Sequence, residues 1–364
     1  MKNISLIIAV GMLSFGKIQA QSKDSLDIMI GQMIMVGYHG GDVTSHPTLL
    51  NDIREGYVGG VILYEKNIDP KQPWIKLKRE VETMQNAAGI PLWISIDQEG
   101  GRVNRLKTKY GFPPSVSAEY LGNINNLDST RFYAELTAST LKGLGINVNF
   151  APDVDLAINP DNPIIAGKGR SYSIDPVKVA DHAEIVVLAH QQLGIVTSLK
   201  HFPGHGSSTG DTHLGMADVT NVWQESELEP YRILIKKESL DAVMTAHIIN
   251  KNLDADGNPA TLSKSIVQGI LRDQLHFDGV VFSDDMHMRA ISDHYGLKNA
   301  LSLSINAGLD VLLFSNNITD SKNSESEKVH RYINELIEEG KISPERIKES
   351  YQRIMILKNK YLHP

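Results

Sequence analysis

The sequence predicts a single α/β domain, a (β/α)8 barrel of the TIM type with long βα loops. Eight short runs of apolar and β-branched residues recur along the chain, and amphipathic helical patterns lie between them. Strands that alternate with helices indicate a parallel sheet. Eight such units over roughly 330 residues fit a barrel, with a doubly wound open sheet as the alternative. No linker rich in Pro, Gly or Ser divides the chain, so we expect one domain from residue 21 to residue 364.

The predicted strands are short stretches in which Val, Ile, Leu, Met or Phe dominate. Continuous apolar runs of this kind are typical of strands that are buried on both faces of a parallel sheet. In chain order they are Met33–Val36, Gly60–Leu63, Leu92–Asp97, Val148–Pro152, Thr197–His201, Ala242–Ala246, Val280–Ser283 and Asp310–Phe314.

The predicted helices repeat apolar residues at helical spacing. They include Gln72–Ala88, Ser129–Leu144, Pro176–Leu193, Lys264–Leu275 and Leu297–Ala307. Two of them have clear starts, because Asp175 precedes a proline at the first helical position and Ser263 stands directly before Lys264. The last helical stretch, Glu327–Lys360, is interpreted as the final barrel helix plus a C-terminal helical extension.

Composition and charge exclude several classes of protein. The chain has 364 residues, with 36 Lys+Arg against 43 Asp+Glu and a formal charge of −7. This acidic balance argues against nucleic acid as a partner, since nucleic-acid binding depends on clustered Lys and Arg. Cysteine is absent, which excludes disulfides, thiolate zinc sites and a cysteine nucleophile. No apolar run after residue 20 reaches the ~18 residues of a membrane span.

The first twenty residues have the pattern of a signal peptide. Lys2 gives a small positive region, Ile4–Phe15 is an apolar stretch, and Ala20 offers a small residue for cleavage. A buried N-terminal helix is the alternative, but polar residues follow at once. We therefore expect residues 1–20 to be removed and the protein to be periplasmic or secreted.

Charged and polar residues stand at five of the eight predicted strand ends, all on one face of a barrel. In a (β/α)8 barrel this face carries the active site. Charged groups directly after apolar strands are costly unless they are paired or used. The five ends are Asp97-Gln98-Glu99-Gly100-Gly101-Arg102, Pro152-Asp153-Val154-Asp155, Lys200-His201-Phe202-Pro203-Gly204-His205-Gly206, His247 and Ser283-Asp284-Asp285.

The segment Lys200–His213, KHFPGHGSSTGDTH, permits three chemical interpretations. Its His and Asp side chains are metal ligands by type, namely His201, His205, Asp211 and His213. Gly206–Gly210 matches the G-x-S-x-G pattern of a serine nucleophile, although that motif needs a strand before it and a helix after it. The pair Asp211 and His213 suits general acid/base catalysis, because a carboxylate on one imidazole nitrogen fixes the tautomer. A loop pinned by His–backbone hydrogen bonds is the structural alternative.

Asp284 and Asp285 follow the strand Val280–Ser283. Adjacent residues on an extended chain point in opposite directions, so one carboxylate is expected to face the barrel axis while the other is held behind it. An inward carboxylate near an Asp–His pair suggests covalent catalysis with an aspartate nucleophile. Either residue could instead cap a helix over Met286–Ile291.

Four segments together resemble glycoside hydrolase family 3, in particular its single-domain β-N-acetylhexosaminidase branch, which includes the cell-wall recycling β-N-acetylglucosaminidases. The resemblance spans roughly residues 28 to 315. Its segments are Ile96–Arg105 (IDQEGGRVNR), Asn159–Tyr172 (NPDNPIIAGKGRSY), Lys200–His213 (KHFPGHGSSTGDTH) and Phe282–Met288 (FSDDMHM).

The resemblance implies a retaining glycosidase that releases terminal β-linked N-acetylglucosamine from peptidoglycan fragments or related glycans, with no metal and no cofactor. The nucleophile of the family falls on Asp284, its acid/base on His213, and the dyad partner of that histidine on Asp211. The sugar-binding positions fall on Asp97, Arg105, Arg170, Lys200 and His201. This is chemically consistent, since retaining hydrolysis needs a nucleophile and an acid/base on opposite sides of the sugar.

The sequence departs from the family pattern in three places. Gly167-Lys168-Gly169 lengthens the approach to Arg170, the expected signal peptide is unusual for a recycling enzyme, and the sandwich domain of many glucosidase members is missing, which favours the hexosaminidase branch. A glycosyl phosphorylase, another β-glycosidase such as a β-glucosidase, and a catalytically silent glycan-binding protein remain as alternatives. The sequence carries no signal for an oligomeric state.

Overall fold

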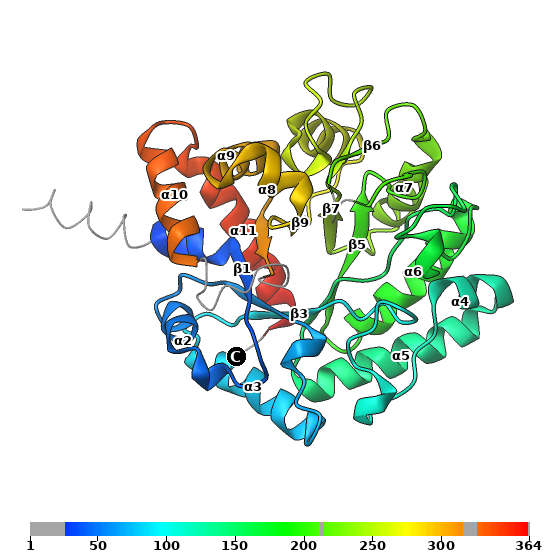
Figure 1. The fold of residues 1–364 in the computed structure, drawn as a ribbon, viewed down its shortest axis with the longest axis horizontal. Coiled ribbons are helices and arrows are strands. Elements are labelled where there is room, and N and C mark those ends of the chain that lie inside the picture. The colour runs from blue at the N-terminus through cyan, green and yellow to red at the C-terminus, as the bar shows by residue number, and fades with distance from the viewer. Residues whose placement is uncertain (1–25, 212–214, 316–325, 363–364) are drawn as a thin grey trace, which may run out of the picture.

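The computed structural model describes residues 26–211, 215–315 and 326–362. Eight parallel strands form a closed barrel in the order β1-β10-β9-β7-β5-β4-β3-β2, and helices surround it (Figure 1). The closed ring excludes the doubly wound alternative. The expected signal peptide at residues 1–20 and the predicted acid/base His213 lie outside the described residues.

All eight predicted strands are confirmed, with ends that shift by up to three residues. Consecutive strands pair in parallel around the ring, and β1 pairs with β10 to close it. The barrel strands are β1 (Ile34–Gly37), β2 (Gly60–Leu63), β3 (Trp93–Ile96), β4 (Val148–Asn149), β5 (Val196–Phe202), β7 (Ala242–Thr245), β9 (Val280–Asp285) and β10 (Val311–Phe314). The sequence did not predict the short parallel pair β6 (Ala217–Asp218) and β8 (Ile248–Ile249).

The predicted helices are also found, and both predicted starts are confirmed. Asp175 accepts a hydrogen bond from Val177 N at 3.0 Å, and Ser263 Oγ accepts one from Ile266 N at 3.1 Å. The segment after Ser263 is a π-helix over Ser265–Gln274. The α-helices are α2 (Pro47–Arg54), α3 (Pro73–Ala87), α4 (Ala118–Ile124), α5 (Leu127–Leu144), α6 (Pro176–Gln191), α7 (Glu229–Lys236), α8 (Arg289–Tyr295), α9 (Leu297–Ala307), α10 (Ser326–Glu338) and α11 (Pro344–Tyr361).

The predicted stretch Glu327–Lys360 is two helices, α10 and α11. Gly340 adopts a left-handed φ of 69° between them, and Ser343 Oγ accepts a hydrogen bond from Arg346 N to start α11. Both features end one helix and begin another. The expected final barrel helix is therefore α10, and the C-terminal extension is the separate helix α11.

Helix α11 packs across the N-terminal ends of the strands, opposite the face where charged residues gather. Asp310, directly before β10, is fully buried and accepts hydrogen bonds from Arg272 at 2.8 Å, Arg346 at 3.2 Å and Ser350 at 2.8 Å. Lys358 Nζ is buried and donates to Gln32 Oε1 at 2.7 Å and Gly59 O at 2.9 Å. These contacts attach the last helix to the floor of the barrel, by which we mean the end formed by the N-terminal ends of the strands.

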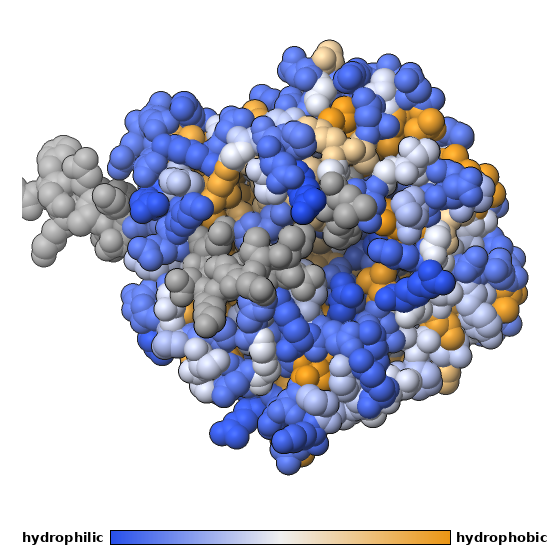
Figure 2. All heavy atoms as spheres, in the orientation of Figure 1, coloured by the Kyte–Doolittle hydropathy of each residue, from blue (hydrophilic) through white to orange (hydrophobic). Residues whose placement is uncertain are grey.

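One large hydrophobic core fills the barrel and the space between the strands and the helices. Aromatic rings occupy part of it, such as Phe150 and Phe282, whose centroids lie 5.3 Å apart in an edge-to-face arrangement. The face of the molecule shown in Figure 2 is mostly hydrophilic, with scattered hydrophobic residues. In the described parts of the chain, none of the helices is both long and apolar enough to cross a lipid bilayer.

Candidate active site

A cavity of ≈ 430 Å³ lies at the carboxyl ends of the barrel strands, a volume typical of a small-molecule site. Six of the eight residues predicted from the sequence line it: Asp97, Arg105, Arg170, Lys200, His201 and Asp284. The other wall residues are Tyr64, Glu99, Arg102, Val103, Lys168, Met244, Asp285, Met288 and Leu313. Asp211 is half-buried and is not one of the wall residues, and His213 lies outside the described residues.

Alternating charges form a continuous network along the wall that follows β3 and β5. Lys200 Nζ lies 2.8 Å from Asp97 Oδ1 and 2.6 Å from Glu99 Oε1. Arg105 Nη2 donates to Asp97 Oδ2 at 3.2 Å, and Arg170 makes two 2.8 Å hydrogen bonds to the Glu99 carboxylate. Burial disfavours the ionised form of both carboxyl groups and by itself would raise their pKa. The neighbouring cations have the larger effect and hold the pKa of Asp97 and of Glu99 below their ordinary values. These two groups are therefore ionised acceptors and poor proton donors.

The turn after β3 depends on two glycines that fold the chain tightly against a neighbouring loop. Gly100 and Gly101 have left-handed φ values of 102° and 56°, and a Cβ on Gly100 would lie 2.2 Å from Val116 O. Gln98 Oε1 then accepts from Arg105 N at 3.0 Å, which brings the arginine back over Asp97. Only glycine adopts such a conformation without strain at so close an approach.

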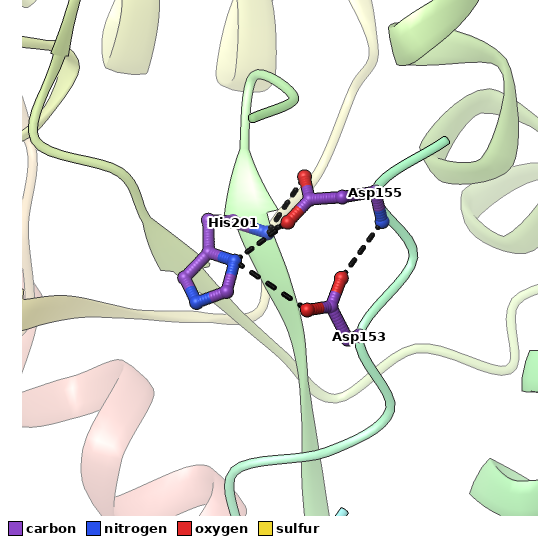
Figure 3. A group of neighbouring side chains, drawn as sticks. All are labelled: Asp153, Asp155 and His201. Carbon is purple, nitrogen blue, oxygen red and sulfur yellow. Dashed lines mark hydrogen bonds and ion pairs between the residues drawn. The ribbon is translucent and has the colours of Figure 1, made fainter. Parts of the chain in front are cut away.

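His201 is held from behind by a carboxylate from the loop after β4. Its Nδ1 lies 2.6 Å from Asp155 Oδ2, a contact drawn as a dashed line in Figure 3. Arg170 Nη2 lies 3.2 Å from its Nε2. Burial, and then the charge of Arg170, lower the pKa of His201 to about 4. The ring is therefore neutral at pH 7, with Nδ1 as a donor to Asp155 and Nε2 as an acceptor toward the cavity side.

Asp153, Asp155 and His201 form the one group of side chains in the described residues with ligand atoms close enough for a metal ion (Figure 3). Arg170 Nε, however, lies 3.1 Å from Asp153 Oδ2 and already supplies a positive charge there. Asp155 also accepts hydrogen bonds from the backbone of His201 and His205. From these contacts we infer that the two aspartates orient the side chains of His201 and Arg170. The wider ligand set suggested by the sequence is incomplete here, since His213 lies outside the described residues.

Asp284 and Asp285 have different environments at the end of β9. Ser315 donates to the Asp285 carboxylate through its hydroxyl and through its backbone N–H at 3.1 Å, and His287 N donates at 3.1 Å. Asp284 Oδ1 accepts from Asp285 N at 2.7 Å, and its side chain is the less buried of the two. Neither aspartate caps α8, which begins at Arg289 with Met288 at its N-cap. Asp285 is thus tied to the barrel, and Asp284 is presented to the cavity.

The serine-nucleophile interpretation of Gly206–Gly210 is wrong. Ser208, the central serine of the pattern, is only 1% exposed and its Oγ donates to Gly210 O at 3.1 Å. Strand β5 ends at Phe202, six residues before Ser208, where the motif requires a strand directly before the serine, and neither serine lines the cavity.

Sequence reasoning assigned no role to several wall residues. Glu99 stands in the motif Ile96–Arg105, and a charged residue three positions after the end of β3 is the signal that could have indicated an ion pair. Tyr64 follows β2 and belongs to none of the motifs, and it lines the cavity beside Arg105, whose guanidinium lies 5.4 Å from the ring centroid. Arg102 and Lys168 come from two different loops that only the fold brings together.

Fold and cavity together define a (β/α)8-barrel protein with a charge-lined, sugar-sized site at the carboxyl ends of its strands. Residues 25–357 match the glycosyl hydrolase family 3 N-terminal domain. The chain therefore belongs to glycosyl hydrolase family 3.

Relatives named as hexosaminidases are similar over most of this chain. Beta-hexosaminidase A of Pseudoalteromonas piscicida is 32% identical over 368 residues, which cover 91% of this chain and 60% of that protein. The beta-hexosaminidase of Tolumonas auensis is 34% identical over 279 residues, or 76% of this chain and 78% of the relative. A family 3 beta-N-acetylglucosaminidase structure from Paenibacillus sp. superposes with a TM-score of 0.84 at 33% identity, covering 92% of this chain and 62% of that one. The chain thus spans about three fifths of the length of two of these relatives.

Proposed function

We propose that this protein is a retaining exo-β-N-acetylhexosaminidase that hydrolyses terminal β-linked N-acetylglucosamine. The observation that carries the proposal is the position of Asp284 in the wall of a cavity that also contains Asp97, Lys200 and Arg170. A nucleophilic carboxylate beside a fixed set of hydroxyl donors and acceptors is what a retaining glycosidase needs. Hexosaminidase relatives that are 32% and 34% identical support the choice of sugar.

In the proposed reaction an oxygen of Asp284 attacks the anomeric carbon while the bond from that carbon to the oxygen of the leaving group breaks. His213 donates a proton to the leaving-group oxygen. In the second step His213 accepts a proton from the water molecule that attacks the anomeric carbon and releases the sugar from Asp284. The network on the β3–β5 wall binds the sugar, with Asp97 as acceptor and Arg105, Arg170 and Lys200 as donors. His201, whose Nε2 lies 3.2 Å from Arg170 Nη2, helps to hold that donor beside the same sugar.

The electrostatics of the cavity support a histidine as the acid. Asp97 and Glu99 have a lowered pKa, and Asp285 is occupied by Ser315 and by the backbone of His287. Asp97 and Glu99 are therefore poorly suited to deliver a proton at neutral pH, and the hydrogen bonds that Asp285 accepts hold it in place at the end of β9. An imidazole with an ordinary pKa of ~6.5 is suited to deliver a proton. Asp211, two residues before His213, is its proposed orienting partner.

The mouth of the cavity favours an acidic aglycone, and hence a peptidoglycan fragment over a neutral glycan. Arg102 is exposed and donates to Gly167 O at 2.7 Å, and Lys168 directly follows Gly167 in that second loop. Neither forms an ion pair with any described residue, whereas Lys200, Arg105 and Arg170 are all paired within the cavity. The lactyl carboxylate of a muramic acid aglycone is a group that such cations would bind.

The nucleophile is tested by trapping. Asp284→Ala should abolish turnover of an aryl N-acetyl-β-glucosaminide, and a 2-fluoro or 5-fluoro glycosyl donor should label Asp284 in the native protein. Labelling found on Asp285 by peptide mass spectrometry would overturn the assignment. Absence of turnover by the native protein would favour the glycan-binding alternative.

Substrate class and reaction type need separate measurements. A panel of aryl β-N-acetylglucosaminide, β-glucoside and β-xyloside should give the highest kcat/KM on the first, and preference for the glucoside would indicate a β-glucosidase. Product analysis with and without inorganic phosphate should give free N-acetylglucosamine in both cases. Formation of the sugar 1-phosphate would establish a phosphorylase instead.

We also propose export to the periplasm or the outside of the cell. The support is the charge, apolar run and small residue within residues 1–20. Protein recovered from a native-like host should begin near residue 21 and fractionate outside the cytosol. A cytosolic protein that begins at Met1 would contradict this proposal.

A further inference from the structure

A buried glutamate outside the cavity holds the base of the loop that follows β5. Glu227 lies in a short 3-10 turn (Glu225–Leu228) before α7 and is 1% exposed. Its Oε2 accepts from Gly206 N at 2.8 Å and from Ser207 N at 3.3 Å, while its Oε1 lies 3.4 Å from Gln224 N. The carboxylate thus joins the turn before α7 to the chain between β5 and Asp211.

The fit between Glu227 and this loop base is close. Gly204 has a φ of 118°, and a Cβ at this position would lie 2.4 Å from the Cβ of Glu227. On the opposite side, Asn162 Nδ2 donates to His205 O at 2.8 Å. Backbone at Gly204–Ser207 is therefore fixed from both sides by side chains of other loops.

Order at the loop base extends toward the proposed catalytic pair. Ser208 Oγ donates to Gly210 O and accepts from Gly210 N, both at 3.1 Å. Glu227 holds Ser207, the Ser208 hydroxyl holds Gly210, and Asp211 is the next residue. A displacement at Ser207 would consequently be carried to Asp211 through a short segment with local hydrogen bonds.

The charge of Glu227 is costly, because the carboxylate is buried and forms no ion pair within the described part of the chain. Among residues 26–211, 215–315 and 326–362, no Lys, Arg or His forms an ion pair with this carboxylate. Burial, together with the charge of Asp155 nearby, raises its pKa to about 7, even though backbone N–H groups favour the ionised form. Tyr231 is the other titratable side chain in electrostatic contact with it. A glutamine at this position would fill the same space and accept a hydrogen bond without the free-energy cost of burying a charge.

We propose that Glu227 is a positioning residue for the reaction: its carboxylate fixes the backbone of Gly206 and Ser207 and so sets the position of Asp211, the proposed partner of the acid/base histidine. This inference rests on the proposed acid/base role of Asp211 and His213. It adds a residue that touches neither the substrate nor the reacting atoms.

The test is Glu227→Gln, which keeps the size of the side chain and one acceptor oxygen but turns an NH2 group toward the N–H of Gln224. We expect kcat/KM to fall about 10- to 100-fold on a substrate with a poor leaving group, a part of the full loss expected without acid catalysis. A dinitrophenyl glycoside should lose less than about threefold, because its leaving group departs without a proton. Inhibition by N-acetylglucosamine should stay within about twofold, since the sugar contacts are unchanged.

The pH profile supplies a second readout. As the pH falls through about 7, Glu227 takes up a proton and loses acceptor strength toward Gly206 and Ser207. The native protein should therefore lose activity on the poor substrate on this acidic side, and Glu227→Gln should lack that component. Glu225→Gln, an exposed glutamate in the same turn, is the matched control and should leave both readouts unchanged.

A third measurement separates this inference from the function on which it rests. If His213→Ala makes the rate depend more steeply on leaving-group pKa and Glu227→Gln does not, the role of Glu227 is refuted while the acid/base assignment stands. If His213→Ala gives an equal loss on all substrates, the acid/base assignment fails first. Should Glu227→Gln not fold, Glu227→Asp keeps the charge and shortens the reach, and an equal loss across the substrate series would refute the positioning role.

Discussion

At the scale of single residues, the carboxylates of the cavity have two different roles: some hold the wall together, and one faces the cavity as the proposed nucleophile. Asp97 and Glu99 are fixed as anions by Lys200, Arg105 and Arg170, so they hold the wall together and offer acceptors. Asp284, the less buried aspartate of the pair on β9, faces the cavity. Sequence reasoning found these residue types through strand ends and motifs. It could not find the pairing of Glu99 with Arg170, because these partners lie 71 positions apart and meet only in the fold.

The acid/base dyad is expected to matter most when the leaving group is poor. His213→Ala should slow natural glycosides by ~10²–10⁴-fold, and the first step of an activated aryl glycoside should suffer less. Asp211→Ala should give a milder form of the same pattern, because the imidazole stays but loses its orienting partner. Rates across substrates graded by leaving-group pKa check this, and an equal loss throughout would mean that His213 binds sugar or holds the loop.

Charge at the cavity mouth should govern the preference for the aglycone. The double change Arg102→Gln with Lys168→Gln should lower kcat/KM on a substrate with a carboxylate on its aglycone by about 10-fold, or roughly 1.4 kcal/mol, as expected for loss of charge-assisted hydrogen bonds. Chitobiose, which is neutral, should be affected less than about twofold on the same grounds. Kinetics on both substrates at low and high salt check the prediction, and equal losses on the two would contradict it.

At the scale of elements, the apolar runs located every barrel strand because a strand buried on both faces has few polar positions. The ends were less certain, since β9 continues through Asp284 and Asp285 although charged residues usually signal the end of a strand. The pair β6 and β8 was missed because two residues leave no periodic pattern. The break between α10 and α11 was missed as well, although Gly340 and the Ser343–Pro344 start carry the usual signals.

Lys358 should make the docking of α11 depend on pH. Burial lowers the pKa of Lys358 to about 7, well below the ~10.4 of a lysine in an unfolded chain. Between these values the unfolded state binds more protons, so the contribution of this group to stability rises with pH from about 7 upward and is constant below.

Urea unfolding of the native protein and of Lys358→Met at pH 7, 8 and 9 measures this effect. The native protein should gain stability relative to the variant at each step, by roughly 1 kcal/mol per pH unit. Lys360→Met, a half-exposed lysine on the same helix, is the control and should not change the slope. Parallel pH curves for the native protein and Lys358→Met would contradict the prediction.

At the scale of the whole molecule, the two ends of the barrel have different tasks. The carboxyl ends of the strands carry the cavity, and the N-terminal ends are closed by α11 and by the buried carboxylate of Asp310. The barrel itself could be predicted from the alternation of strands and helices. The closure of the floor could not, because Asp310 meets Arg272 and Arg346 only once the last helix has folded back.

Removing the charge at the centre of the floor should therefore reduce stability and leave catalysis intact. Asp310→Asn leaves Arg272 and Arg346 without their buried counter-ion, a change that costs about 3–5 kcal/mol in comparable buried pairs. Chemical denaturation should show this loss, while kcat/KM of the folded variant at 25 °C stays unchanged. Arg353→Gln removes the more exposed partner, 3.4 Å away, and should cost under about 1 kcal/mol. A comparable cost for both variants would contradict this account.

The barrel can close only after β10, the partner of β1, has been synthesised. β1 needs β10 as its neighbour, and Gln32 accepts its hydrogen bond from Lys358, 326 positions later in the chain. At ~5–20 residues per second a ribosome takes on the order of 20–60 s to make that stretch. During this interval β1 has an open edge and the floor has no cover. Under the proposed export, this late closure would keep the early strands available to an export machinery until nearly the whole protein has been made.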